Sequence, residues 1–360
     1  MSGERVEWIS GEGVFADLAA AWRALAETIG ALFGRPEWYA AWWEAFGDGE
    51  LETLCIFRDD ALVAVVPFSR RGRTLRALSN VHTPTFGPLA ADHAATARVL
   101  AAVRSAAAEV GFASVPVGPR GSDQLVTAAR AAGLVLLLRN AHVSPLVDTT
   151  GAFEDWRRET KPRWHAPLDR YRRKMVRDLG ADIRVVAPPE DLTTELETGL
   201  ALQLAGWKGR QATAILSRED TARFYRRIVA DFHALGLTRF SSIIVDGRPI
   251  AWEFQLLHQN RLWGMNGAID EGFKKFSPGL VLKLALIERC FALGLDAYEF
   301  IGGDEDWKGK FATGRRAHVD IELYRPAPVP LAHFAARRSG QVAVRALRRA
   351  QAARASGDNV

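Results

Sequence analysis

Residues 239–258, RFSSIIVDGRPIAWEFQLLH, decide the fold of this chain. Two runs rich in apolar residues flank the dipeptide Asp246-Gly247, which is typical of the tight turn in a β-hairpin. Residues 51–70, LETLCIFRDDALVAVVPFSR, repeat this pattern around Asp59-Asp60. The sequence therefore predicts two similar β-hairpins, one in each half of the chain.

The repeat continues beyond the two hairpins. When Asp59 is aligned with Asp246, Leu75 falls opposite Leu262. Each hairpin is followed by a further strand pattern, a loop that contains Phe and Gly, a long helical pattern and a short strand pattern. We therefore expect a tandem duplication of one α/β unit, in which each copy is a mixed, mostly antiparallel sheet flanked by helices.

The duplication divides the chain into three predicted segments. An amino-terminal unit spans residues 1–150, a carboxy-terminal unit spans residues 151–330, and a tail spans residues 331–360. The tail is rich in Ala and Arg, and its apolar residues recur at helical spacing, which predicts a helix that frays toward its end. Such a basic helix would fit contact with an anionic membrane surface or a partner, or would simply be solvated.

Composition indicates an ordinary soluble protein with two domains, because 48% of its 360 residues are hydrophobic and 25% are charged. Its two cysteines, Cys55 and Cys290, lie in apolar runs without a CxxC spacing, so we expect reduced thiols and no metal. The amino terminus lacks a signal-peptide pattern, and no apolar run approaches the roughly 18 residues that a membrane span needs. These features predict a cytoplasmic location.

Charge favours anionic partners. The net charge is +5, and residues 157–177 carry nine Lys or Arg against two Asp or Glu. This basic stretch would suit a nucleotide-sugar, a lipid diphosphate or an RNA backbone, or would be a solvated helix face. Pro162 and Pro167 are expected to break it into pieces, which argues against one continuous nucleic-acid helix.

The loop before the second long helix, residues 272–280, predicts a phosphate site. Ser277 is a candidate N-cap, Pro278 suits the first helical position, and Gly279 allows close approach to the first free amides. With Lys274 and Lys275 just upstream, the helix start could hold a diphosphate. An ordinary capped helix with solvated lysines would give the same pattern.

The first copy lacks these features. Its loop, TPTFGPLAADHAAT, contains no lysine and places Asp92 near the helix start. A carboxylate there would repel a phosphate, so we expect the first copy to be a degenerate scaffold.

Four segments of the second half together resemble the CelD-like (BioF2-like) acetyltransferases of the GNAT fold, which are similar in turn to the Fem-type aminoacyl transferases. They are GWKGRQATA, VDGRPIAWEFQL, FSPGLVLKLAL and YEFIGGDEDWKGKFA. The resemblance covers roughly residues 147–325, with weaker support from LFGRPEWYAAWWEAFG. It implies tandem GNAT-like units and acetyl-CoA or another acyl-CoA as the donor.

The resemblance also implies a donor loop, formed by residues 274–280 with Phe276 and Leu280 included. The loop differs from the common GNAT phosphate loop, which is richer in glycine and lacks the proline.

Two tetrapeptides of similar sequence, WKGR at residues 207–210 and WKGK at 307–310, would then face each other across the transfer cleft. Lys208 and Arg210 would hold an anionic part of the acceptor. Lys308 and Lys310 would neutralise donor phosphate or a developing oxyanion. The predicted substrate-binding set is Trp207, Lys208, Arg210, Asp304 and Trp307. Alternatively, each Trp caps a core edge and each Lys is merely solvated.

Direct attack on a thioester needs a base, and two strand carboxylates are candidates. Glu253 interrupts the apolar strand IAWEFQL, and Glu299 lies in AYEFIGG. Burial would raise the pKa of either carboxyl toward a useful range, although a solvent-facing strand carboxylate is also common. The predicted catalytic set is Glu253, Glu299 and Lys308.

Three functions remain open at this point. The first is an acyl-CoA-dependent N- or O-acyltransferase, for which the resemblance implies a sugar or other cell-envelope precursor as acceptor. The second is a Fem-like transferase that uses aminoacyl-tRNA, which the basic stretch favours. The third is a non-catalytic nucleotide-binding regulator on the same fold.

Overall fold

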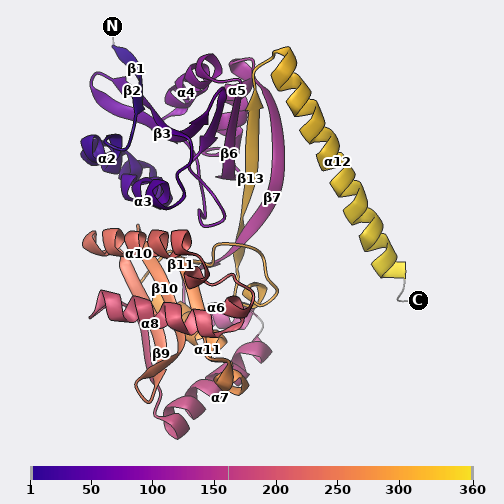
Figure 1. Ribbon diagram of the computed structural model, residues 1–360. Helices are drawn as coiled ribbons and strands as arrows, with labels where there is room; N and C mark the ends of the chain where they lie inside the picture. The colour runs from indigo at the N-terminus through magenta and orange to yellow at the C-terminus, as the bar shows by residue number, and fades with distance from the viewer. Residues whose placement is uncertain (1–2, 161, 358–360) are drawn as a thin grey trace. The chain divides into compact units, whose positions relative to one another are not determined.

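A computed structural model describes residues 3–160 and 162–357 of the chain (Figure 1). The chain divides into two compact units, which are described separately below. Unit 1 comprises residues 1–39, 47–141 and 318–360, and unit 2 comprises residues 40–46 and 142–317.

The first half of the chain supplies most of unit 1. Its elements are β1 (Glu4–Ser10), α1 (Val14–Asp17), α2 (Ala19–Ile29), η1 (Leu32–Gly34), α3 (Pro36–Phe46), β2 (Glu50–Arg58), β3 (Ala61–Arg71), β4 (Thr74–Ala77), β5 (Leu89–Ala90), α4 (His93–Ala106), β6 (Glu109–Pro116), α5 (Ser122–Ala131) and β7 (Val135–Asp148).

The second half repeats this order and ends in a long helix. Its elements are α6 (Phe153–Glu159), α7 (Pro162–Leu179), β8 (Asp182–Ala187), α8 (Leu192–Ala205), α9 (Trp207–Arg210), η2 (Ile215–Ser217), α10 (Glu219–Ala234), β9 (Thr238–Val245), β10 (Arg248–His258), β11 (Arg261–Ile269), η3 (Glu271–Phe276), α11 (Pro278–Ala292), β12 (Ala297–Glu299), η4 (Lys308–Lys310), β13 (Gly314–Tyr324) and α12 (Pro328–Gly357).

Both predicted hairpins are present. Strands β2 and β3 pair antiparallel around Asp59-Asp60, and β9 and β10 pair antiparallel around Asp246-Gly247. All four turn residues have positive φ, as the tightest hairpin turns require. Most positions in the middle of β2, β3 and β10 are buried, as expected for strands that are covered on both faces.

The two units share one strand order, which confirms the predicted duplication of a mixed, mostly antiparallel sheet. In unit 1, β1, β2, β3 and β4 pair antiparallel in turn, and β4 then pairs in parallel with β6. In unit 2, β8, β9, β10 and β11 do the same, and β11 pairs in parallel with β12. The parallel step follows in each case from the long helix, α4 or α11, that connects its two strands.

The last strand of each repeat begins in one unit and ends in the other. Residues Leu146–Asp148 of β7 pair with β12 in unit 2, and His318–Tyr324 of β13 pair with β6 in unit 1. The compact units therefore differ from the linear segments 1–150 and 151–330. These strand pairs join residues that are far apart in the sequence, so no local sequence pattern indicates them. A division of the chain into consecutive segments therefore misses them.

Helices cover both faces of the sheet in unit 2 (Figure 1). Gly199 of α8 lies against the Trp252 ring, whereas Lys283 of α11 contacts Glu253, the next residue of β10. Because successive strand residues point to opposite faces, α8 and α11 lie on opposite sides.

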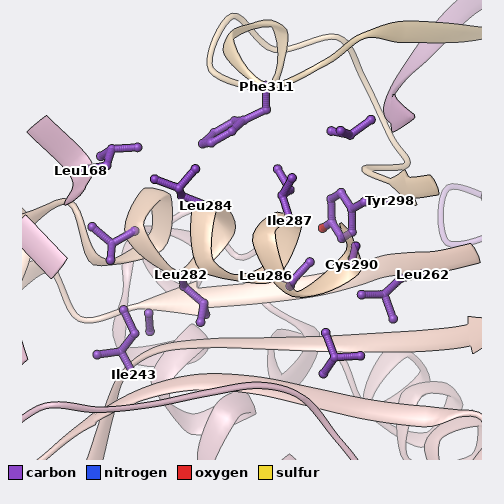
Figure 2. Close-up of a cluster of buried hydrophobic side chains, with 14 of the residues drawn as sticks. Leu168, Ile243, Leu262, Leu282, Leu284, Leu286, Ile287, Cys290, Tyr298 and Phe311 are labelled. Atoms are coloured by element: carbon purple, nitrogen blue, oxygen red, sulfur yellow. The ribbon is translucent and has the colours of Figure 1, made fainter. Parts of the chain in front are cut away.

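Helix α11 is apolar on nearly every side, and it forms the centre of the core of unit 2. Figure 2 shows Leu282 and Leu286 pointing from α11 toward the strands, while Leu284 and Ile287 point toward Phe311. Full burial of such a side chain contributes roughly 1.5–3 kcal/mol. The core therefore fixes α11, and with it the few polar groups that α11 carries.

Two local predictions from the basic segments have different outcomes. Pro167 does not break the basic stretch, because α7 continues through it to Leu179. A proline near the start of a helix removes only one backbone hydrogen bond, which packing of Leu168 and Met175 offsets. The predicted helix in the tail is present as α12.

Across residues 3–160 and 162–357, no helix combines the length and apolarity that crossing a membrane requires.

Candidate active site

Strands β11 and β12 of unit 2 diverge after a short parallel pairing. They pair at three positions that end at Trp263 and Glu299. Beyond that point the chain after β12 turns to β7, where the Phe300 amide donates to the Pro145 carbonyl at 3.1 Å. Strand β11 continues to Ile269 with β10 as its partner. The divergence leaves one edge of β11 open.

A bulge lies at the start of this open edge. Phe254 of β10 is opposite Asn266, whereas Gln255 is opposite Gly264, so Met265 is an extra residue in β11. Bulges redirect side chains and are frequent beside active sites. Here the bulge places Asn266 beside Gln203 of α8, whose side-chain nitrogen Nε2 donates to Asn266 Oδ1 at 2.5 Å.

Glu253 of β10 is a buried carboxylate beside Gly264, the residue of β11 that follows the last pair with β12. Tyr298 of β12 donates its hydroxyl hydrogen to Glu253 Oε1 at 2.6 Å. The ammonium of Lys283 contacts both Glu253 Oε2 and the Tyr298 hydroxyl. All three side chains are buried. Burial raises the pKa of Tyr298 well above its usual range and lowers the pKa of Lys283.

Two further lysines interact electrostatically with this cluster. Burial lowers the pKa of Lys208, while Glu253 opposes that shift and Lys308 adds to it. Lys208 donates to the side-chain oxygen of Asn266 at 2.8 Å and to the Gly267 carbonyl at 3.2 Å. Three lysines and the carboxylates of Glu253 and Glu305 therefore interact electrostatically in this part of unit 2.

Lys308 is held by backbone oxygens. It donates to the carbonyls of Ile301 at 2.8 Å and Gly303 at 2.9 Å, and it pairs with Glu305 at 2.6 Å. Ile301 has φ +47°, a left-handed conformation that is strained for a β-branched residue. Such strain is typically retained where it positions a functional group.

The predicted donor loop leads into α11 at the far end of β11. Ser277 occupies the predicted N-cap position, but it has φ +49° and its side chain makes no capping hydrogen bond. The physical reason is that a capping residue needs an extended backbone. Pro278 takes the first helical position as predicted. The helix start is therefore not capped by a side chain.

The loop is close to the end of β11 and to helix α7. A methyl group on Gly279 would lie 2.8 Å from Ile269, the last residue of β11. Lys275 lies 5.1 Å from the centre of the Phe276 ring, and Lys174 of α7 lies 5.9 Å from the same ring. The open edge of β11 thus runs from Gly264, beside Glu253, to a helix start with basic neighbours.

A family model described as an acetyltransferase (GNAT) domain matches residues 165–309. Residues 165–309 form a GNAT acetyltransferase domain. The match confirms the resemblance to the CelD-like acetyltransferases, and it includes the whole cluster around Glu253. No curated protein matches the sequence of this chain.

Solved structures with the same fold have little sequence in common with this chain. FemX has 10% identity and a TM-score of 0.59, and the alignment covers 91% of this chain and 99% of FemX. The C-terminal domain of a putative lysylphosphatidylglycerol synthetase from Agrobacterium fabrum has 15% identity and a TM-score of 0.53, with 89% and 95% covered. These similarities confirm the fold class.

The GNAT domain brings only part of the predicted site together. Lys208 and Lys308 both interact with the Glu253 cluster, whereas Arg210 makes a two-point ion pair with Glu271 at 2.9 and 2.8 Å. Asp304 pairs with Arg315 at 2.7 Å. Arg210 and Asp304 thus already have partners of opposite charge.

The tryptophans of the two WKG tetrapeptides have different surroundings. Trp207 is 46% exposed beside Lys208, and Trp307 packs edge-on against Phe300. Lys310 lies 4.8 Å above the Trp164 ring. Gly209 serves packing, because a methyl group there would lie 1.7 Å from the Leu204 carbonyl oxygen.

Glu299, the other candidate base, has a different environment from Glu253. Its side chain is 1% exposed and accepts hydrogen bonds from Arg261 at 2.7 Å and Arg316 at 2.6 Å. Both neighbours of this carboxylate are therefore guanidinium groups, which engage it in two ion pairs. The geometry favours Glu253.

The corresponding place in unit 1 is filled by the chain itself. The pairing of β4 with β6 ends at Arg76 and Gly111. Beyond it, the Phe86 amide donates to the Ser114 carbonyl at 3.0 Å, and the Ser114 hydroxyl donates to the Pro84 carbonyl at 3.2 Å. The Phe86 ring is buried and stacks on Phe112.

The helix start in unit 1 is also occupied. Asp92 accepts a hydrogen bond from the Ala95 amide at 2.7 Å, and the Arg58 guanidinium together with backbone amides holds the pKa of Asp92 below its usual value. An ionised carboxylate therefore takes the place of a ligand phosphate.

Sequence reasoning missed Lys283, Tyr298 and Asn266. Lys283 did have a signal, because it is the single cation between leucines in LVLKLAL. Tyr298 resembles any buried strand aromatic, and Asn266 depends on the bulge, so neither had a local signal. Within residues 3–160 and 162–357, no three His, Cys, Asp or Glu side chains are grouped as a metal site would need.

Proposed function

We propose that this protein is an acyl-CoA-dependent N- or O-acyltransferase that transfers an acetyl or related acyl group by direct attack of the acceptor. The observation that carries the proposal is the position of Glu253. It is a buried carboxylate that contacts Lys283 and interacts with Lys208, beside the point where β11 and β12 diverge.

The donor would occupy the open edge of β11. Its diphosphate would bind the start of α11, with Lys274, Lys275, Phe276, Ser277, Gly279 and Leu280 as the contacting residues. The amides of its extended arm can pair with backbone groups of an open strand edge. This path would bring the thioester to Glu253.

Glu253 would take the proton of the attacking amine or hydroxyl. The acceptor then forms a bond to the thioester carbon, the carbon–sulfur bond breaks, and CoA departs as a thiolate. Lys308 would stabilise the oxyanion that develops on the carbonyl oxygen. Each step uses groups of this chain and its two substrates only.

The acceptor would carry an anionic group, held by Lys208 beside the exposed ring of Trp207. A sugar or other cell-envelope precursor is the acceptor class that the resemblance to the CelD-like acetyltransferases supports. The proposal also retains the predicted cytoplasmic location, where acyl-CoA and such precursors would meet.

The experiment that tests this function measures free CoA thiol released from acetyl-CoA in the presence of a panel of amino sugars and sugar nucleotides. In parallel, CoA, acetyl-CoA and aminoacyl-tRNA are tested for a rise in melting temperature, because only a ligand of the native state produces one. We expect acetyl-CoA to raise the melting temperature and at least one acceptor to release CoA. Binding of acetyl-CoA without transfer of its acyl group would instead support a non-catalytic nucleotide-binding regulator.

A Fem-like transferase is the second candidate, and one feature of α7 favours it. Arg163, Arg170, Arg173 and Lys174 are exposed at helical spacing, while Arg157 and Arg172 pair with Asp169. The outer bases are therefore available to an RNA backbone. A rise in melting temperature with aminoacyl-tRNA, lost at higher salt, would support this candidate over the first.

A further inference from the structure

Glu253, Lys283 and Tyr298 form a closed ring of three polar contacts. Lys283 contacts Glu253 Oε2 and the Tyr298 hydroxyl, and Tyr298 donates to Glu253 Oε1 at 2.6 Å. The three residues come from β10, α11 and β12, and Lys283 is 6% exposed. A proton can therefore pass between Glu253 and Lys283 without a water molecule.

Apolar groups surround Lys283 on its remaining sides. The rings of Tyr298 and Phe300 lie 4.5 and 5.4 Å from its nitrogen. The other titratable groups that act on it are Cys290 of α11, whose thiol has a pKa raised to about 12 by burial, and Lys308 of η4. Glu253 is its one anionic partner among these groups. Burial lowers the pKa of Lys283, so its ammonium releases a proton more readily than an exposed lysine does.

We propose that Lys283 is the proton store for acyl transfer: the acceptor proton passes to Glu253 and from Glu253 to the Lys283 amine, while Tyr298 holds the two groups in place. The inference rests on the proposed function. Lys283 acts through Glu253 and touches no substrate, so Lys283 and Tyr298 are positioning residues.

The proton and electron pairs balance through the cycle. The acceptor loses a hydrogen from nitrogen or oxygen, and its freed electron pair forms the bond to the thioester carbon. The proton ends on Lys283 as an ammonium. Glu253 then returns it from Lys283 to the departing CoA thiolate, which leaves as a thiol and restores the neutral amine.

Charge explains why a lysine behind the carboxylate helps. If Glu253 kept the proton, the reaction would leave a neutral acid beside an amine. If Lys283 takes it, the reaction creates an ion pair in a buried place, where opposite charges attract strongly. The pair is thus a stronger base than the carboxylate alone, and it is active only while Lys283 is neutral.

The first test measures the titration of Lys283 itself by NMR of the lysine side chains, on the whole protein without substrate. The Lys283→Arg variant assigns the signal by its loss, and exposed Lys275 is the internal control. We expect Lys283 to titrate below its usual value of about 10.5, and to shift in Tyr298→Phe. Titration at or above that value would overturn the inference.

The second test compares rates and pH profiles. Arg keeps the positive charge but does not release its proton, so Lys283→Arg should lower kcat by roughly 10²–10⁴ and remove the acid limb of the profile. Tyr298→Phe should keep the fold and shift the pH at which the rate falls on the acid side of the profile. Acetyl-CoA affinity, measured by calorimetry, should change less than about twofold.

The outcomes separate this inference from the proposed function. An active wild-type protein whose Lys283→Arg variant keeps its rate and its pH profile would overturn the proton store alone. A wild-type protein that transfers no acyl group would overturn the proposed function, and the inference with it. If Lys283→Arg does not fold, Tyr298→Phe and the wild-type titration decide.

Discussion

Gly264 faces the hydroxyl of Tyr298 so closely that a methyl group on Gly264 would lie 2.1 Å from the hydroxyl oxygen and 2.9 Å from Glu253 Oε1. Gly264→Ala should therefore displace Tyr298 and cost about 1–3 kcal/mol in the free energy of unfolding. The free energy of unfolding, measured by urea denaturation, and the turnover should both decline. Gly309→Ala is the matched control, because its methyl group would lie 3.6 Å from the nearest atom. Equal stability of both variants would contradict the tight contact.

Glu253→Gln should lower turnover by roughly 10²–10⁴ and leave donor affinity nearly unchanged, because an amide cannot accept the acceptor proton. Glu299→Gln should chiefly lower stability, by about 1–3 kcal/mol, since Arg261 and Arg316 lose an anionic partner. Steady-state kinetics and thermal denaturation of both variants give the comparison. A selective loss of turnover in Glu299→Gln would transfer the role of base to Glu299.

Lys208→Ala should weaken acceptor binding, whereas Lys308→Ala should impair donor binding or the chemical step. A charge-assisted contact in a partly desolvated place is worth roughly 1.5–3 kcal/mol, which is a ten- to hundredfold loss. Arg210→Ala is the control, because its side chain is 61% exposed and an exposed ion pair contributes little. Kinetics with each substrate varied separately would refute the assignment if neither lysine variant changed a constant more than about twofold.

Donor binding should involve only the second repeat. Hydrogen exchange with acetyl-CoA bound should protect residues 274–280 and leave residues 83–92 unchanged, because Asp92 and the chain itself occupy the place in unit 1. Lys275→Ala should weaken donor affinity about tenfold, or about 1.4 kcal/mol. Asp92→Asn should have no such effect, and protection of residues 83–92 would disprove the asymmetry.

Stability should depend on pH through Lys208. Burial lowers the pKa of Lys208 in the folded state, so the unfolded chain binds more protons between that lowered pKa and about 10.5. The free energy of unfolding should therefore rise with pH across this window. The rise should be smaller in Lys208→Met, in which the titrating group is absent. Urea denaturation at a series of pH values from 7 to 10 compares the two proteins, and parallel curves would contradict the shift.

The hairpins and the duplication were predictable because their signals are local. Turn residues such as Asp246 and the apolar runs beside them are neighbours in the sequence, and Glu253 stood out as a charge in an apolar strand. The ring around Glu253 was not predictable, because Lys283 and Tyr298 meet it only after α11 has packed on the sheet. Sequence placed the two WKG lysines near one site, but the partners of Arg210 and Asp304 depend on loops that no periodicity describes.

Strands β7 and β13, which each pass from one unit into the other, have a consequence for synthesis on the ribosome. The sheet of unit 1 includes His318–Tyr324 at the β6 edge, so this sheet is complete only after almost the entire chain has emerged. Until then β6 offers unpaired backbone groups that can bind other chains. Expression of residues 1–150 alone should therefore give an aggregating fragment, and a stop codon before residue 318 should harm the first half of the protein as much as the second.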